Sequence, residues 1–62
     1  MVFNEKDICE LKYAMIKKWG KTSQQKLADE MGVSRTAINN AINNYPSLDK
    51  LRIKIKEWMK NC

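Results

Sequence analysis

A run of small hydrogen-bonding side chains between residues 34 and 43 is the part of this sequence best suited to bind a partner. At about 100° per residue of helix, these side chains share one face within an arc of roughly 140°. They are Arg35, Thr36, Asn39, Asn40 and Asn43. Asn and Thr are poor helix formers, and a helix that only faced water would favour Glu, Lys or Gln. We therefore interpret this face as a recognition surface rather than a solvated one, with donors and acceptors of the kinds that read the edges of DNA bases.

The opposite face of the same segment is apolar, which indicates that it packs against another element. It holds Ala37, Ile38, Ala41 and Ile42. Upstream, Leu27, Ala28 and Met31 have the spacing of the inner face of a shorter helix. Gly32 follows directly and can end that helix in a left-handed conformation, and Ser34 can cap the next helix. The two segments together predict a helix-turn-helix in which the small Ala28 lets the backbones approach closely.

This stretch resembles the helix-turn-helix of the lambdoid phage Cro and repressor family. The matching positions are Gln24, Ala28, Gly32 and Val33, followed by Ala37-Ile38-Asn39 and Ala41-Ile42. The resemblance implies a small all-α, four-helix, lambda-repressor-like domain, because the tail predicts a helix where lambda Cro itself continues in strands. In size and order of motifs the chain is also similar to the N-terminal DNA-binding domain of the phage Mu transposition-activating ATPase.

The resemblance also implies which residues contact double-stranded DNA. The residues that would face bases in the major groove are Ser34, Arg35, Thr36, Asn39 and Asn40. Gln24 would contact a phosphate. The further candidates for phosphate contacts are Ser23, Asn43, Lys17, Lys18 and Lys21. The three lysines are included because they lie close in sequence to the start of the first of the two helices.

Composition limits the possible functions. The chain has 62 residues, a formal net charge of +5 and no His, so we expect one domain with a small core and a polyanionic partner. Two Cys without His cannot form a zinc site of the usual ligand count. Sequence alone leaves a disulfide between Cys9 and Cys62 open, although a cytosolic context argues against it. No apolar run approaches the roughly 20 residues of a membrane span, so we expect a soluble cytoplasmic protein that does not bind membranes.

Four helices are predicted, at about residues 5–19, 23–31, 34–43 and 48–60, all in one domain that covers residues 1–62. Asn4, Ser23, Ser34 and Ser47 are the expected N-caps. The first helix should bury a stripe that includes Leu11, Met15 and Trp19, with Cys9 as a small core or boundary residue. The apolar stripe of the last helix contains Leu48, Leu51, Ile55, Trp58 and Met59.

The lysines and Ile53 of the last predicted helix lie outside its apolar stripe and are expected at the surface. These lysines are expected to be solvated or to face phosphate, and they are Lys50, Lys54, Lys56 and Lys60. Ile53 projects roughly opposite the apolar stripe, and two explanations stay open for it. It is either a lone exposed apolar residue, which is common, or part of a contact with a second copy of the chain.

We expect no enzyme, cofactor, metal or small-molecule substrate, because the carboxylates lie in exposed helical contexts and no Gly-rich phosphate loop is present. The leading hypothesis is a sequence-specific transcriptional regulator of the phage Cro/repressor type, which binds DNA as a possible homodimer. An alternative is a weakly selective DNA-binding N-terminal domain of a larger transposition/ATPase protein. A third is a helix-turn-helix that contacts other proteins.

Overall fold

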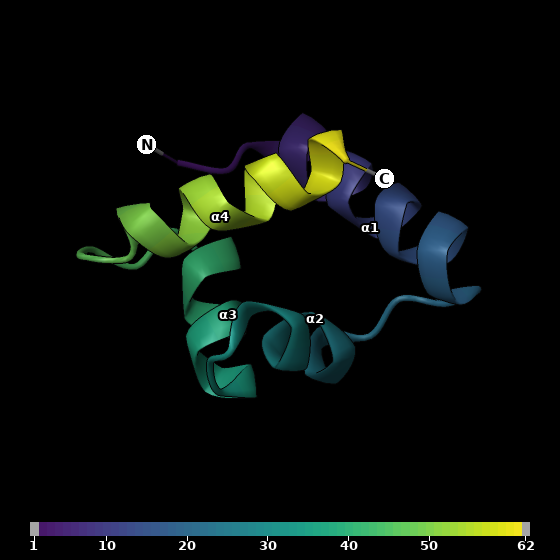
Figure 1. Ribbon diagram of the computed structural model, residues 1–62. Coiled ribbons are helices and arrows are strands. Elements are labelled where there is room, and N and C mark those ends of the chain that lie inside the picture. Colours follow the sequence, from purple (N-terminus) through teal and green to yellow (C-terminus); the bar gives the residue numbers. More distant parts are fainter. Residues whose placement is uncertain (1, 62) are drawn as a thin grey trace.

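The computed structural model describes residues 2–61, which form four α-helices and no strand. The helices are α1 (Glu5–Trp19), α2 (Gln24–Met31), α3 (Arg35–Ile42) and α4 (Asp49–Lys60). Each lies where the sequence predicts a helix, with every boundary within one residue of the expected position. The predicted all-α, four-helix fold is therefore confirmed (Figure 1).

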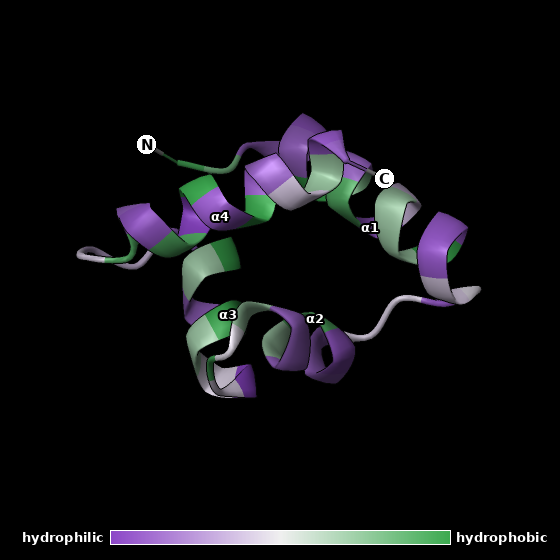
Figure 2. Cartoon of the chain, viewed as in Figure 1, coloured by the Kyte–Doolittle hydropathy of each residue, from purple (hydrophilic) through white to green (hydrophobic). Residues whose placement is uncertain are grey.

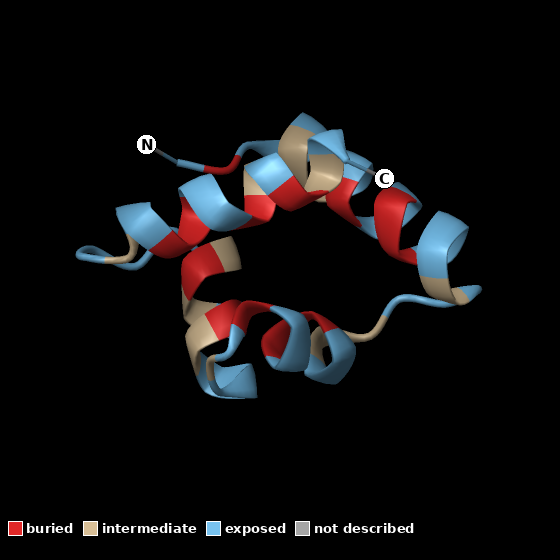
Figure 3. Ribbon diagram, in the orientation of Figure 1, coloured by how far each residue is buried: buried red, intermediate tan, exposed pale blue. Residues whose placement is uncertain are grey.

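The helices form two layers around one core. α2 packs most closely against α3, while α4 contacts each of the other three helices. α1 and α4 lie above α2 and α3 in the view of Figure 1. Each helix turns apolar ribbon toward the space between these layers (Figure 2), where the buried residues lie (Figure 3), although some apolar residues such as Ile53 are exposed. The buried hydrophobic residues are Phe3, Leu11, Ala14, Met15, Leu27, Ala28, Met31, Ile38, Ala41, Leu51, Ile55 and Trp58.

Local capping explains why the first three helices begin where they do. The Asn4 side chain accepts the Asp7 N–H at 2.9 Å while the Asp7 carboxylate accepts the Asn4 N–H at 3.1 Å, which makes a complete capping box. The Ser23 and Ser34 hydroxyls cap α2 and α3 by accepting the backbone N–H of Lys26 and of Ala37, without the reciprocal bond of a capping box. Gly32 then ends α2 with φ +70°, a conformation that a residue without Cβ adopts at little cost. These caps set both ends of α2 and the start of α3, as the sequence predicts.

The loop from α3 to α4 differs from the prediction. Ser47 was expected to cap α4, but its φ of +71° turns it away from cap geometry, and Leu48 occupies the N-cap position instead. Asn44 is also left-handed, with φ +63°. Its side chain accepts the Phe3 N–H at 2.6 Å and donates to the Phe3 carbonyl at 2.8 Å. The loop is therefore tied to the N-terminal segment rather than closed by a serine cap.

Arg52 is a basic residue of the tail whose burial the sequence did not predict. Only 2% of its surface is exposed. Its guanidinium donates to the Ala41 carbonyl at 3.2 Å, to the Tyr45 carbonyl at 3.0 Å and to the Asp49 carboxylate at 2.8 Å. Burial is tolerated because the planar fork can satisfy several acceptors at once.

Two further side chains bear on the surface. Cys9 is exposed, so its assignment to the core or its boundary was wrong; Cys62 lies outside the described residues. Ile53 is 46% exposed, which is compatible with both explanations given for it. No helix within residues 2–61 is long and apolar enough to span a bilayer.

Candidate nucleic-acid interface

The two faces of α3 separate as the periodicity predicts. Ile38 and Ala41 are fully buried against the rest of the domain. Arg35, Thr36 and Asn39 are exposed on the opposite side. The other candidates on this face are the half-buried Asn40 and the exposed Asn43, which is the C-cap of α3. The helix therefore presents a short surface of hydrogen-bonding groups that no core contact occupies.

Ser34 has a structural role that limits what it can contribute to binding. It is exposed, but its Oγ accepts the Ala37 N–H at 3.1 Å. The hydroxyl can still donate its own hydrogen to an outside acceptor. Ser34 is thus a helix cap first and a candidate donor second.

A shallow hollow of about 370 Å³ lies where the starts of α2 and α3 meet. Its lining residues are Lys12, Thr22, Ser23, Gln24, Gln25 and Arg35. Two of these side chains are cationic. The first backbone N–H groups of α2 also lie at this position, and helix N-termini favour anions. The hollow therefore has the electrostatic character of a phosphate-binding surface.

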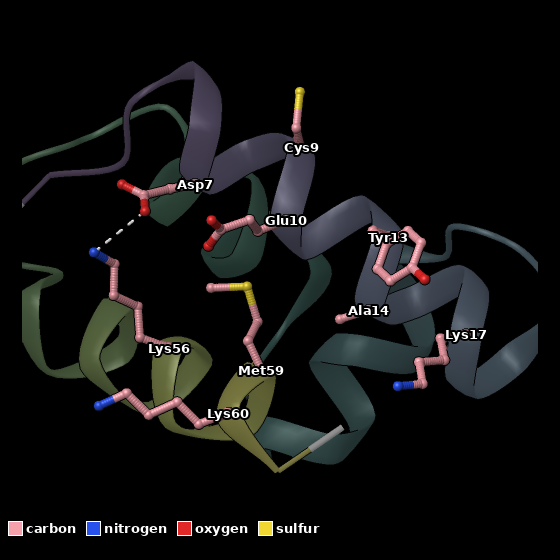
Figure 4. Close-up of a pocket in the computed structure, with 9 residues that line it drawn as sticks. All are labelled: Asp7, Cys9, Glu10, Tyr13, Ala14, Lys17, Lys56, Met59 and Lys60. Carbon is pink, nitrogen blue, oxygen red and sulfur yellow. Dashed lines mark ion pairs between the residues drawn. The ribbon is translucent and has the colours of Figure 1, made fainter.

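The lysines predicted to contact phosphate are not all brought to this hollow. Lys18 pairs with Glu30 at 3.2 Å, and its ammonium also lies 5.4 Å from the centroid of the Trp58 ring. Lys17 instead lines a groove of about 740 Å³ between α1 and α4 (Figure 4). Lys21 is exposed in the loop between α1 and α2. Only Ser23, Gln24 and Arg35, of all the predicted contacts, line the hollow together.

Lys12 is the residue at this surface that sequence reasoning missed. It follows Leu11 of the buried stripe and points toward α2, because it lines the hollow with the first residues of that helix. A helical wheel places Lys12 and Lys17 about 140° apart on α1. The wheel shows that they face different ways, but only the packing of α1 on its neighbours shows which of them faces α2.

Arg52 fixes the far end of α3. Its bonds to the Ala41 and Tyr45 carbonyls join the last turn of α3 and the following loop to α4. The hydrogen bond from Arg52 is the main cause that holds the pKa of the Asp49 carboxyl below its ordinary value. Asp49 is therefore ionised at neutral pH and keeps the guanidinium oriented. This arrangement holds α3 at a defined angle to the rest of the domain.

Comparisons with known proteins agree with this geometry. A family model described as helix-turn-helix matches residues 12–54, which is more than half of the chain and includes α2, the turn and α3. Searches of curated proteins and of solved structures gave no significant match. Within residues 2–61, no group of three or more His, Cys, Asp or Glu side chains could hold a metal ion. The chain belongs to the helix-turn-helix family of lambda repressor- and Cro-like DNA-binding domains.

Proposed function

We propose that residues 1–62 act as one DNA-binding domain of a sequence-specific transcriptional regulator of the phage Cro/repressor type. In this proposal α3 lies in the major groove of an operator, and two copies bind together. The protein acts in the cytoplasm and represses a promoter by occupying the operator. The observation that carries the proposal is the exposed polar face of α3, which begins beside the cationic hollow at the start of α2. Base-reading groups and phosphate-binding groups then lie next to each other on one surface.

Base readout would come from the first turns of α3. Arg35 stands at the exposed start of the helix, and its fork matches the O6 and N7 acceptors of guanine. Asn39 lies one turn later on the same face and can pair with both groups on the major-groove edge of adenine. Thr36, between them, can offer its methyl group to thymine. Ser34 and Asn40 complete the proposed base-contacting set.

Phosphate contacts would come from the surface around the start of α2. Gln24 and Ser23 line the hollow there, together with Lys12. We keep Lys17, Lys18, Lys21 and Asn43 in the proposed phosphate set. The structure favours Lys21 over Lys17 and Lys18, because Lys18 is engaged by Glu30 and Lys17 faces the groove between α1 and α4.

The test is a selection from random duplexes, followed by affinity measurements on the selected site and on random DNA. Arg35→Ala and Asn39→Ala should each cost about 1–3 kcal/mol on the selected site and much less on random DNA. Lys21→Ala should weaken both to similar extents, since bonds to phosphate carry no sequence information. It should also reduce the slope of log affinity against log salt by about 0.9, because one phosphate is no longer neutralised. Lys60→Ala is the matched control, because Lys60 lines the groove on the α1–α4 side.

The outcomes separate the competing functions. If Arg35→Ala and Asn39→Ala weaken both DNAs equally, α3 does not read sequence, and the weakly selective N-terminal domain of a larger transposition/ATPase protein becomes the better proposal. If the wild type shows no salt-dependent DNA binding, the helix-turn-helix instead serves protein contacts.

A further inference from the structure

The outward side of α1 carries an apolar stripe that the proposed DNA contacts do not use. It consists of Cys9, Tyr13 and Ile16, which we call the outer seam. Tyr13 is 70% exposed and Ile16 is 51% exposed, and Cys9 is exposed beside them. The buried residues Leu11 and Met15 lie on the opposite side of the same helix. α1 is thus apolar on both sides, although only one side faces the core.

The spacing of the outer seam is that of a helix–helix contact. Intervals of four and then three residues separate Cys9, Tyr13 and Ile16, which is the alternation of the a and d positions of a heptad. Such a seam lies along one line of the helix and can receive the seam of a second helix. The spacing therefore favours another helix as the occupant rather than a small molecule.

Charges beside the seam indicate which helix fits. Glu10 and Lys17 lie seven residues apart on one flank of the seam, and Figure 4 shows both at the groove between α1 and α4. Within residues 2–61 neither side chain forms an ion pair. An acidic and a basic group one heptad apart are self-complementary when two copies of a helix run in opposite directions. The acidic group of each copy then lies near the basic group of the other copy.

We propose that the outer seam of α1 is a homodimer interface in which the α1 helices of two copies pair antiparallel. Tyr13 packs on the partner's Ile16, and the two-fold axis repeats this contact with the roles exchanged. The same alignment brings Glu10 near the partner's Lys17, again twice, so in this dimer Lys17 pairs with Glu10 instead of contacting a phosphate. In a parallel pair equal positions lie level, so these two charges would not meet. This inference deepens the proposed pairing of two copies on DNA and names the surface that makes it.

The small size of the outer seam determines how stable the dimer is expected to be. α1 has 15 residues, so at 1.5 Å per residue its length is about 22 Å. Two helices of this length bury less than the roughly 1,600 Å² of a standard interface. We therefore expect a weak dimer in free solution, populated at high protein concentration and reinforced when two copies occupy adjacent half-sites.

Ile53 is a poorer candidate for this contact. It is 46% exposed, but the α4 residues one turn away on either side, Asp49 and Glu57, are charged. A single apolar side chain between charges gives little desolvated area. Ile53 therefore serves as the comparison residue in the test.

The test measures the dimer dissociation constant of the 62-residue chain by sedimentation equilibrium at low salt, with reductant and without DNA. Glu10→Lys and Lys17→Glu should each raise this constant about tenfold, because two exposed ion pairs become two repulsions. The double variant Glu10→Lys/Lys17→Glu should return it to near the wild-type value. Tyr13→Asp should leave only monomer, while Ile53→Asp should change nothing. All these side chains are exposed, so thermal melts should confirm that each variant folds.

The opposite results overturn the proposal. A double variant as weak as the single variants would show that Glu10 and Lys17 do not meet, and an effect of Ile53→Asp alone would move the interface to α4. A wild type that is monomeric throughout, up to about millimolar concentration, would remove the interface. Affinity for a single half-site tests DNA binding independently of the dimer. Tyr13→Asp should bind such a half-site as tightly as the wild type does. Failure of DNA binding is therefore distinguishable from failure of the dimer.

Discussion

Replacing the buried Arg52 should test the most unusual interaction in the core. Arg52→Met keeps much of the side-chain volume but removes the donors to the Ala41 and Tyr45 carbonyls. Hydrogen bonds from a charged group contribute about 1.5–3 kcal/mol each. The Ala41 carbonyl keeps a second donor, the Asn44 N–H at 3.2 Å, which reduces the loss. The Asp49 carboxylate is 60% exposed, so solvent screening makes the contribution of the Arg52–Asp49 ion pair to stability small.

We therefore expect Arg52→Met to lower the free energy of unfolding by about 2–3 kcal/mol. The measurement is urea unfolding followed by helical circular dichroism. With a slope near 1 kcal/mol/M for a small protein, the midpoint should fall by about 2–3 M. Arg52→Lys keeps the positive charge and can reach one of the carbonyls, so its unfolding midpoint should lie between those of the wild type and Arg52→Met. Asp49→Asn is the control and should change the midpoint least.

A variant Arg52→Met with the same midpoint and slope as the wild type would refute this reasoning. It would mean that apolar packing at this position replaces the hydrogen bonds without loss, as happens when some buried ionic groups are exchanged for hydrophobic ones. A changed slope would instead indicate a change in the compactness of one of the two states.

Two further predictions concern local features. Gly32→Val should destabilise by more than about 1 kcal/mol, because a β-branched side chain resists the left-handed φ of +70°. Crowding is not the obstacle: apart from the chain neighbours of Gly32, no atom of residues 2–61 lies within 4 Å of an added Cβ. Equal melting temperatures of the two proteins would contradict this prediction. The Asn4 backbone N–H, and secondarily Lys56, lower the pKa of Asp7 below its ordinary value of 3.8. Its folded pKa lies below its unfolded pKa, so this stabilisation is present above pH 3.8 and is lost as the pH falls through the folded pKa. Asp7→Asn should show a smaller loss of stability on acidification below pH 3.8, as measured by chemical unfolding at each pH.

The helices could be predicted because their signals are local. Asn4, Ser23 and Ser34 each accept a backbone N–H three residues ahead, and Gly32 needs only its own φ to end α2. None of these contacts depends on how the helices pack. Ser47 looked equivalent to the other serines, but its loop is shaped by Asn44 and Phe3, which are distant in sequence. The prediction of a Ser47 cap failed because a long-range contact determines the backbone conformation of this loop.

Packing also explains what the sequence did not show about the site. On the wheel of α4, Arg52 lies beside the apolar stripe, and no sequence pattern indicated its acceptors. The folded chain directs its guanidinium to the carbonyls of Ala41 and Tyr45. Lys12 and Lys17 carry the same side chain on the same helix. Only the packing of α1 brings Lys12 to the hollow and Lys17 to the opposite groove.

The tie between Asn44 and Phe3 has a consequence for the order in which the chain folds. It joins residues 41 positions apart, whereas α2 and α3 are neighbours in sequence and pack most closely. Closing a long loop costs more chain entropy than closing a short one. We therefore expect α2 and α3 to associate early and the N-terminal segment to dock last. Asn44→Ala should then speed unfolding while it leaves the folding rate nearly unchanged, as stopped-flow kinetics would show.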